Sequence, residues 1–488
     1  MWFRARREFF RQMKPPGAYG DAEGLAALEG ALRRDLDVLS YPARSWVPEH
    51  RTADGSPILD VLIVGGGQSG LGAAYGLMRE RVSRLLVVDD AEPGFSGPWN
   101  TFARMVTLRT PKYLTGADFG LPNLSFRRWY EAQFGAGGWE SLGLIPKEQW
   151  AEYLAWYRGV LGLPVRHGVR AGAIRRLEAD GCFEVPLEGG SARETLRARK
   201  VILATGIDGS GRWEAPACVS ALPRALWAHT HEPIDFEALR GKRLGVLGAG
   251  ASAFDNASVS LEAGAASVDL FFRRKTLPTV NPYRWAEFVG FLGHHGDLPD
   301  ADRWRFIRKI IEMGQLPPKD TFERARRHPH FKLHAASGWL EAEARGGKAL
   351  VRTQAGEHAF DFLILGSGFV TDLSVRPELA EIHPHIALWK DRFTPPPAER
   401  IEDLLRHPYL GAAFELQEKV PGATPWISSI FNYTFGCLLS LGFGGASISG
   451  MKYSLPRLVG GVTAQLYVDD RALHFQSLAD YVTPEFES

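Results

Sequence analysis

The sequence predicts an α/β protein with two parallel, doubly wound sheets, and three observations lead to this prediction. An apolar strand beginning at Ile58 runs directly into a glycine-rich turn, and a second strand over 243–247 does the same. Each turn is followed by a helical pattern and then by another apolar strand, at 84–89 and at 267–272. Such alternation favours parallel sheets covered by helices. Because the two units lie far apart in the chain, we expect two nucleotide-binding domains.

The composition indicates a soluble globular protein. The 488 residues are 45% hydrophobic and 23% charged, and 57 Lys and Arg balance 56 Asp and Glu to a net charge of +1. A charge this close to zero gives no global field that would attract nucleic acid or an anionic membrane. No apolar run reaches the length of about 18 residues that a membrane span needs. We expect a cytoplasmic protein whose partners are small molecules, with no nucleic-acid partner.

Neither the cysteines nor the histidines suggest a metal site. Cys182, Cys218 and Cys437 are widely separated and form no C-x-x-C pair and no zinc-ligand spacing. We expect apolar free thiols in a reducing compartment. His294 and His295 are adjacent but have no cluster of Cys or acidic residues near them in the sequence. The expected metal content is therefore none.

The chain divides into four segments. The boundaries that we predict are 1–54 for a helical N-terminal extension, 55–218 and 355–488 for the two parts of the first domain, and 219–354 for a nested second domain with a helical insert. Within the extension, apolar spacing over 22–39 predicts an amphipathic helix. The basic and aromatic opening, 1–17, would pack on the body or on a partner subunit, with peripheral membrane contact as the alternative.

The first glycine turn has the pattern G-x-G-x-x-G. We expect it to hold the pyrophosphate of a dinucleotide through the turn and the first residues of its helix, which are Gly65, Gly67, Gln68, Ser69 and Gly70. An acid at the end of the second strand would accept a hydrogen bond from a ribose hydroxyl. Asp89 stands at that place, and its neighbour Asp90 is the rival candidate.

The second turn has the permitted variant G-x-G-x-x-A. Gly248, Gly250 and Ser252 would hold a second pyrophosphate. The following strand ends in Arg273 and Arg274 where the first unit has an acid. A guanidinium binds a 2′-phosphate bidentately, whereas a carboxylate would repel it, so this turn favours NADP over NAD. A solvated basic face is the alternative interpretation.

Four further motifs narrow the class of protein. The strand over 201–206 ends in Ala-Thr-Gly, and a related strand over 361–368 is followed by Asp372. Residues 96–99 read Ser-Gly-Pro-Trp, similar to G-G-x-W, and His229 precedes the second turn at the spacing of F-x-G-x-x-x-H. Together these motifs resemble the two-dinucleotide-binding-domain flavoproteins, most closely the class B flavin-dependent monooxygenases of the flavin-containing and N-hydroxylating types.

The resemblance implies an FAD-binding Rossmann-like domain with a nested NAD(P)-binding Rossmann-like domain. It implies that NADPH reduces FAD, that O2 then forms a C4a-peroxyflavin, and that one oxygen enters an amine, thioether or carbonyl substrate. The cofactor-binding residues implied in addition to the two turns are Asp89, Asp90, Trp99, Thr205, Gly206 and Asp372. Arg109 or Lys112 would face the flavin as a catalytic group.

Two segments outside these motifs are also candidates. Gly444 and Gly445 precede a helical pattern, and their backbone could present N–H groups to the pyrimidine edge of the flavin. The insert over 276–339 is too long for a simple connection, and its aromatic residues suggest either a substrate wall or a lid or subunit contact.

Two other functions remain open at this stage. The first alternative is an NAD(P)H-dependent flavin oxidoreductase that passes electrons to a quinone or another small acceptor. The second is a flavin-binding scaffold protein. A disulfide reductase is excluded because the chain has no C-x-x-C to supply a dithiol. The sequence leaves the substrate and the oligomeric state open, although an oligomer is possible.

Overall fold

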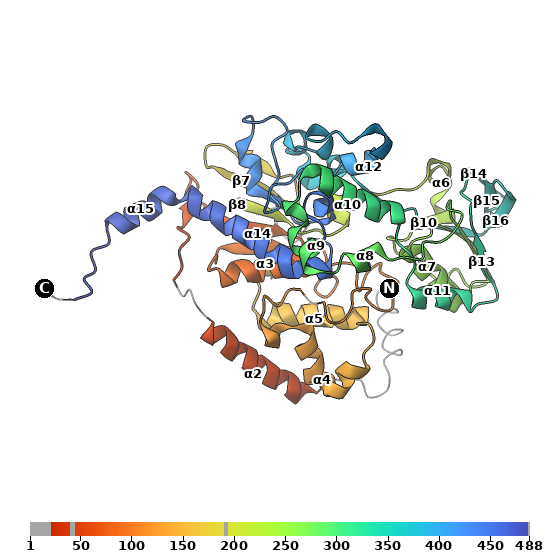
Figure 1. Cartoon of the computed structure of the whole chain (residues 1–488), viewed down its shortest axis with the longest axis horizontal. Helices are drawn as coiled ribbons and strands as arrows, with labels where there is room; N and C mark the ends of the chain where they lie inside the picture. Colours follow the sequence, from red (N-terminus) through yellow and green to blue (C-terminus); the bar gives the residue numbers. More distant parts are fainter. Residues whose placement is uncertain (1–20, 40–43, 115, 190–193, 487–488) are drawn as a thin grey trace.

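The computed structural model describes residues 21–39, 44–114, 116–189 and 194–486. The prediction for the opening residues 1–17 lies outside these ranges. Figure 1 shows a larger and a smaller α/β domain, with helix α15 extending away from the body. None of the described helices has the length and apolar character needed to cross a membrane.

The larger domain contains the first glycine turn. Its sheet is centred on β2 (Pro57–Val64), which runs parallel to β3 (Leu85–Val88) and to β8 (Glu194–Leu203). The flanking strands are β1 (His50–Arg51), β4 (Val165–Arg166), β5 (Arg170–Ala171), β6 (Arg175–Leu177), β7 (Cys182–Glu188) and β19 (Ile430–Asn432). The predicted strands at 58 and 84–89 are therefore present as β2 and β3.

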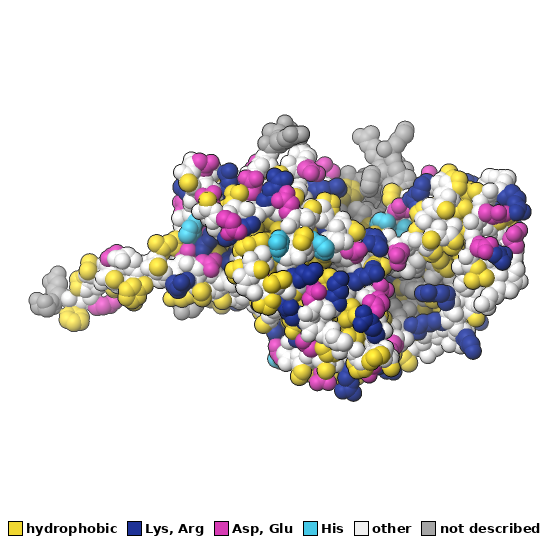
Figure 2. Space-filling view, turned by 90° about the horizontal axis from the view of Figure 1, so that it is seen from above, with side chains coloured by type: hydrophobic (Ala, Val, Ile, Leu, Met, Phe, Trp, Pro, Cys, Tyr) yellow, Lys and Arg dark blue, Asp and Glu magenta, His cyan; other side chains and the backbone are white. Residues whose placement is uncertain are grey.

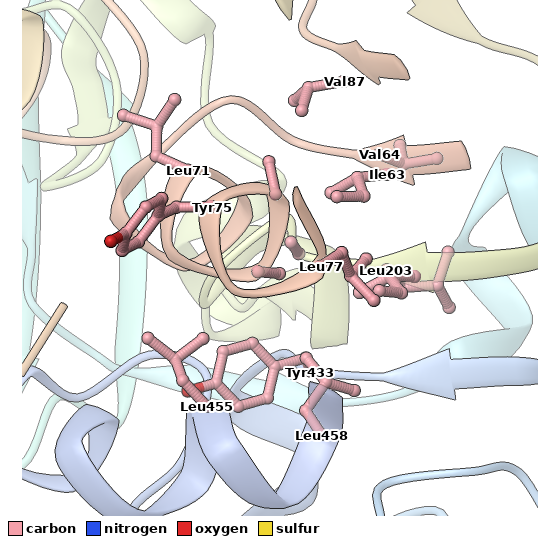
Figure 3. Packing of buried hydrophobic residues seen from close by; sticks show 14 of the residues in the cluster. Ile63, Val64, Leu71, Tyr75, Leu77, Val87, Leu203, Tyr433, Leu455 and Leu458 are labelled. Atoms are coloured by element: carbon pink, nitrogen blue, oxygen red, sulfur yellow. The ribbon is translucent and has the colours of Figure 1, made fainter. Parts of the chain in front are cut away.

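Helix α3 (Gln68–Arg79) covers this sheet and packs against α14 (Ile448–Asp469). Gly72 and Gly76 of α3 allow this approach, since a Cβ at either position would meet Leu455 or Val459 of α14 at 2.6 Å. Figure 3 shows the apolar side chains of the two helices around the strands. The predicted helix over 22–39 is present as α2 (Ala22–Val38), which packs on α4 (Phe126–Ser141), and α5 (Lys147–Val160) lies beside α4.

The smaller domain contains the second glycine turn. Its five parallel strands are β10 (Trp227–His229), β17 (Phe362–Leu365), β11 (Arg243–Leu247), β12 (Ser267–Phe271) and β13 (Phe331–His334), in that spatial order. Helices α7 (Ala251–Glu262) and α11 (Lys319–Arg326) pack together on this sheet, and α6 (Ala217–Ser220) lies near the antiparallel strands β14 (Glu341–Arg345), β15 (Lys348–Thr353) and β16 (Gly356–Phe360).

The structure corrects one predicted domain boundary. The sequence assigned 355–488 to the larger domain, but β17 pairs with β10 and β11 in the sheet of the smaller one. The chain returns only after Leu365, through β18 (Phe369–Thr371), which pairs with β9 (Gly211–Trp213) in a two-stranded link. An apolar strand of this type can belong to either sheet, so the sequence alone did not show which sheet contains β17.

The first part of the insert packs on the larger domain, whereas α11 and β13 near its end belong to the smaller domain. The helices of this first part, α8 (Pro282–Trp285), α9 (Val289–His294) and α10 (Asp300–Met313), share an apolar cluster with α12 (Glu402–Leu405) and α13 (Leu438–Leu441). Trp304 and Trp389, both fully buried, form the centre of this cluster. The segment over 425–435 begins with a 3-10 turn (Pro425–Ser429), and β19 follows it as an extended strand.

Candidate active site

The first glycine turn leaves room for a ligand next to its backbone. Gly65 has φ +110°, and a side chain there would meet the carbonyl oxygen of Ala204 at 2.5 Å. A Cβ on Gly70 would overlap the carbonyl of Gly65, which explains why helix α3 can start so close to β2. Around Gly67, the first residue before that helix, nothing lies within 4 Å of the Cβ position. This is the open backbone approach that a pyrophosphate requires.

Asp89 and Asp90 have different environments at the end of β3. The Asp89 carboxylate is buried and accepts hydrogen bonds from the backbone N–H groups of Gly66, at 2.5 Å, and Ala91, at 2.8 Å. Burial raises the pKa of Asp89, opposed by these two hydrogen bonds. Asp90 points to the surface, where it forms a 2.9 Å ion pair with the exposed Arg170. The geometry therefore favours Asp89 as the ribose-binding acid.

Three buried polar atoms without a partner in the described part of the chain lie on segments that flank the first turn. Among the described residues, Ser96 Oγ, Trp99 Nε1 and Thr205 Oγ1 are buried and accept or donate no hydrogen bond. A buried polar group without a partner is costly, so these atoms fit a ligand with hydrogen-bonding atoms. They lie on the loop after β3 and at the end of β8, two segments that flank the first turn. The donor set is that expected for the flavin part of FAD.

The segment before α14 contacts the first turn of α3. Ser69, in the first turn of α3, donates a hydrogen bond to the carbonyl of Gly445, and Gln68 accepts one from Trp150 at 3.1 Å. A Cβ on Gly445 would overlap the carbonyl of Tyr433, and one on Gly444 would meet the Cys437 sulfur at 2.8 Å. The two glycines thus let their backbone pack closely against residues 433–437. Gly206 has φ +67°, and its carbonyl accepts a hydrogen bond from the backbone N–H of Phe435.

The second turn repeats the geometry of the first. Gly248 has φ +129°, and a side chain there would overlap the carbonyl of Gly366, whereas the space around Gly250 is open. Ser252 is exposed in the first turn of α7. Arg273 and Arg274 are exposed after β12, but they differ, because Arg274 donates to the carbonyls of Glu312 and Met313 at the end of α10. Arg273 is therefore the stronger candidate for a 2′-phosphate.

The two predicted catalytic residues have other partners in the structure. Arg109 Nη2 donates to Asp255 Oδ2 at 2.9 Å, which joins the loop of the larger domain to helix α7 of the smaller one. Asp255 is almost fully buried, and this burial raises its pKa although Arg109 opposes the effect. Lys112 donates to the carbonyls of Trp139 and Leu142 at 2.6 and 2.7 Å, at the end of α4. Its ammonium therefore holds a helix end, in contrast to the flavin-facing role that the sequence suggested.

The sequence patterns did not reveal some residues near the junction of the two domains, and they revealed the roles of others only in part. Arg104 donates to the carbonyls of Thr230 and Glu232, both at 2.6 Å, and thus ties the same loop to the end of β10. No local pattern singles out Arg104, because these two carbonyls are more than 120 residues away. His229 is buried with its Nδ1 at 3.0 Å from that of His231, and burial lowers the pKa of His229 to about 4. Asp372 caps a short turn through the N–H of Ser374 and pairs with Arg212.

The comparisons with known proteins agree with this arrangement. A family model described as FAD-NAD(P)-binding matches residues 62–208, and one described as L-lysine 6-monooxygenase/L-ornithine 5-monooxygenase matches 140–285. The chain is 46% identical over 463 residues to the FAD-dependent urate hydroxylase of Xanthomonas campestris pv. campestris. The aligned region covers 95% of this chain and 97% of that protein. The chain belongs to the FAD-dependent monooxygenase family.

Solved structures share the fold of this monooxygenase at low sequence identity. The ornithine N-hydroxylase of Kutzneria sp. 744 superposes with a TM-score of 0.65 at 14% identity, covering 84% of this chain and all of that one. The ornithine hydroxylase of Pseudomonas aeruginosa gives 0.66 at 15% identity with the same coverage. The predicted fold class, the FAD and nicotinamide cofactors and the monooxygenase activity are therefore confirmed. Among the described residues, no group of three potential metal ligands occurs.

We predict that Asp89→Ala weakens FAD binding about 10- to 100-fold, because a charge-assisted hydrogen bond to a ribose hydroxyl contributes roughly 1.5–3 kcal/mol. Asp90→Ala is the matched control and leaves FAD affinity unchanged, since Asp90 pairs with Arg170 at the surface. Titration of the apoprotein with FAD, followed by flavin fluorescence, measures both. A larger loss for Asp90→Ala than for Asp89→Ala would contradict the assignment.

We further predict that Arg109→Met and Asp255→Asn each slow reduction of the bound flavin by NADPH roughly 10- to 100-fold, because misplacing reactants by about 1 Å has an effect of that order. The double variant is no slower than either single one, since both changes break the same contact between domains. Stopped-flow absorbance of the flavin measures the three rates. Multiplying effects, or an effect of Arg109→Met alone, would instead favour a direct contact of Arg109 with the flavin.

Proposed function

We propose that this monooxygenase hydroxylates urate or a closely related oxopurine, with NADPH as the reductant and O2 as the oxygen donor. The observation that carries the proposal is the 46% identity to a urate hydroxylase along 95% of the chain. This identity extends over both glycine turns, the insert and α14. At that coverage the two chains share the segments that build the substrate wall as well as those that bind the cofactors.

The aromatic lining beside the flavin site suits a flat substrate. Tyr283 of the insert stacks on Phe443 with ring centroids 5.3 Å apart and an interplanar angle of 21°. Phe291 contacts Phe443 edge-on, with ring centroids 5.5 Å apart, and Phe443 directly precedes Gly444. These rings lie between α9 and the start of α14, where the insert covers the larger domain. Phe291 and Phe443 are buried in this cluster and Tyr283 is half-buried, so the rings form a packed aromatic wall beside the start of α14. A rigid wall of this kind suits a planar oxopurine better than a flexible aliphatic amine.

The chemistry balances with the cofactors that the two domains bind. NADPH supplies two electrons, one atom of O2 enters the substrate, and the other leaves as water. When bound to these residues, FAD would supply the hydride-accepting and O2-activating chemistry, so the protein needs no catalytic triad. The residues of this chain hold the two cofactors, keep the domains in register and exclude water from the cavity. Asp89, Gly67 and Gly250 carry the first of these roles, and Arg109 with Asp255 the second.

We expect urate to accelerate NADPH consumption by the FAD-loaded enzyme at least tenfold over the rate without substrate, with one oxygen from ¹⁸O2 in the product. Ornithine, lysine, cadaverine, a thioether and a ketone are the comparison substrates. The match to the lysine/ornithine monooxygenase model makes the amines the second candidate. Coupled oxygenation of an amine, with no response to urate, would overturn the urate proposal. NADPH oxidation that only produces peroxide would favour the flavin oxidoreductase.

In this proposal, the preference of the enzyme for NADPH over NADH depends on Arg273. We expect Arg273→Ala to raise the KM for NADPH about 10- to 100-fold with little change for NADH, because the guanidinium contacts only the 2′-phosphate. Arg274→Ala is the matched control, since Arg274 already donates to the carbonyls of α10, and it changes the two KM values equally. Steady-state kinetics with both coenzymes gives the result. Equal effects of Arg273→Ala on both would mean a solvated basic face.

A further inference from the structure

The last helix of the chain exposes an apolar surface that nothing in the described chain covers. We call residues 471–486, which include α15 (Arg471–Ala479), the C-terminal arm. No residue of α15 is buried, and Phe475 is 71% exposed. The other exposed large apolar side chains on and beside the arm are Tyr467, Val468, Leu473, Leu478, Tyr481, Val482 and Phe486. Figure 1 shows the arm projecting from the body, and Figure 2 shows apolar side chains along it.

The arm exposes an unusual number of large apolar side chains for a monomer surface. An aromatic side chain buries about 150–250 Å² when covered, and the arm region carries four exposed ones besides its aliphatic residues. The largest apolar patch of a typical monomer is roughly 300–600 Å². Eight exposed large apolar side chains over 467–486 are the kind of surface that a protein interface covers, at roughly 800 Å² per partner.

The base of the arm is fixed by a buried ion pair. Asp470, between α14 and α15, accepts two hydrogen bonds from Arg199 of β8, at 2.8 and 2.9 Å, and one contact from His50 at 2.9 Å. Its side chain is 2% exposed. The first turn of the arm is also held, because His474 stacks on Tyr467 with ring centroids 4.8 Å apart. The arm thus leaves the body in a defined direction.

A groove suited to this arm lies at its own base. A cavity of about 380 Å³ beside α14 is lined by Trp46, Glu80, Gly460, Thr463, Ala464 and Tyr467. Its floor is formed by small residues of α14, so an apolar helix can approach closely. The arm continues α14 in nearly the same direction (Figure 1) and cannot fold back onto this groove while Asp470 is held.

We propose that the C-terminal arm binds the groove of a second copy of this chain, and that the two arms are exchanged in a two-fold symmetric dimer. Phe475 lies seven residues after Val468, and Gly460 lies eight residues before it, so both separations span about 10–12 Å of helix. A two-fold axis beside Val468 therefore places Phe475 of one copy over Gly460 of the other. The same operation places the partner's arm on the first groove. A closed pair of this kind uses both apolar arms and both grooves and leaves neither exposed.

Charge favours a protein partner over a lipid surface. Helices that lie on membranes carry Lys and Arg on the polar face. Arg471 is the single Lys or Arg over 471–486, and Asp480 and Glu485 are acidic. A second copy, with its small-residue groove, fits this surface better than an anionic membrane does.

Sedimentation of the FAD-loaded protein at micromolar concentrations tests the proposal. We expect twice the chain mass of 54.0 kDa for the natural sequence. Phe475→Ser with Leu478→Ser weakens the dimer at least tenfold, because aromatic anchors dominate interface energies. The matched control is Leu340→Ser on the smaller domain, which is 52% exposed and leaves the mass unchanged. A monomeric natural protein, or an arm variant that remains a dimer, would overturn the proposal.

A groove variant distinguishes this dimer from any other. Gly460→Arg fills the groove, and it does not disturb its own chain because nothing lies within 4 Å of the Cβ position. We expect it to weaken the dimer as the arm variant does. A mixture of the two variants forms heterodimers more readily than either variant dimerises alone, because one intact arm meets one intact groove. Absence of this rescue, or arm-dependent binding to phosphatidylglycerol vesicles with a monomeric protein, would refute the exchange. None of these readouts depends on the substrate.

Discussion

The contact between the two domains is the constraint on which the activity depends. A hydride passes between cofactors only when their reacting atoms lie about 3–3.5 Å apart, so the two sheets must face each other in a fixed register. The loop after β3 supplies this register through Arg104, which donates to carbonyls at the end of β10, and through Arg109, which pairs with Asp255 on α7. Because Asp255 is buried, its interaction with Arg109 is stronger than a surface pair would be.

The sequence predicted what is local and missed what joins remote segments. The glycine turns, the strands at 58, 84–89, 243–247 and 267–272 and the helix over 22–39 follow from patterns within a few residues, and they are present. The partners of Arg109 and Lys112 depend on elements that are 146 and about 30 residues away, so a motif argument could only place both near the flavin. The position of β17 depends on strand pairing, which two sheets of similar sequence leave undecided.

The site divides into a part that motifs reveal and a part that packing creates. Cofactor-binding residues lie at strand ends and first helical turns, where the backbone carries the interaction and a glycine pattern marks it. The aromatic wall brings Tyr283 of the insert onto Phe443, 160 residues later, although no spacing in the sequence relates them. The orphaned polar atoms of Ser96, Trp99 and Thr205 are likewise visible only after folding. Substrate identity is therefore the property that the sequence pattern alone determines least.

Helix α14 connects the chemistry to the proposed dimer. Its first turn follows the Gly444–Gly445 backbone, where we propose that the flavin edge binds, and its last turn is held at Asp470 by Arg199. With 22 residues, the helix is about 33 Å long. A partner that binds the groove near Gly460 and the arm beyond Asp470 therefore contacts the end of α14 that is distant from the flavin cavity. In the proposed dimer, such a partner holds the helix in place without covering the aromatic wall at its start.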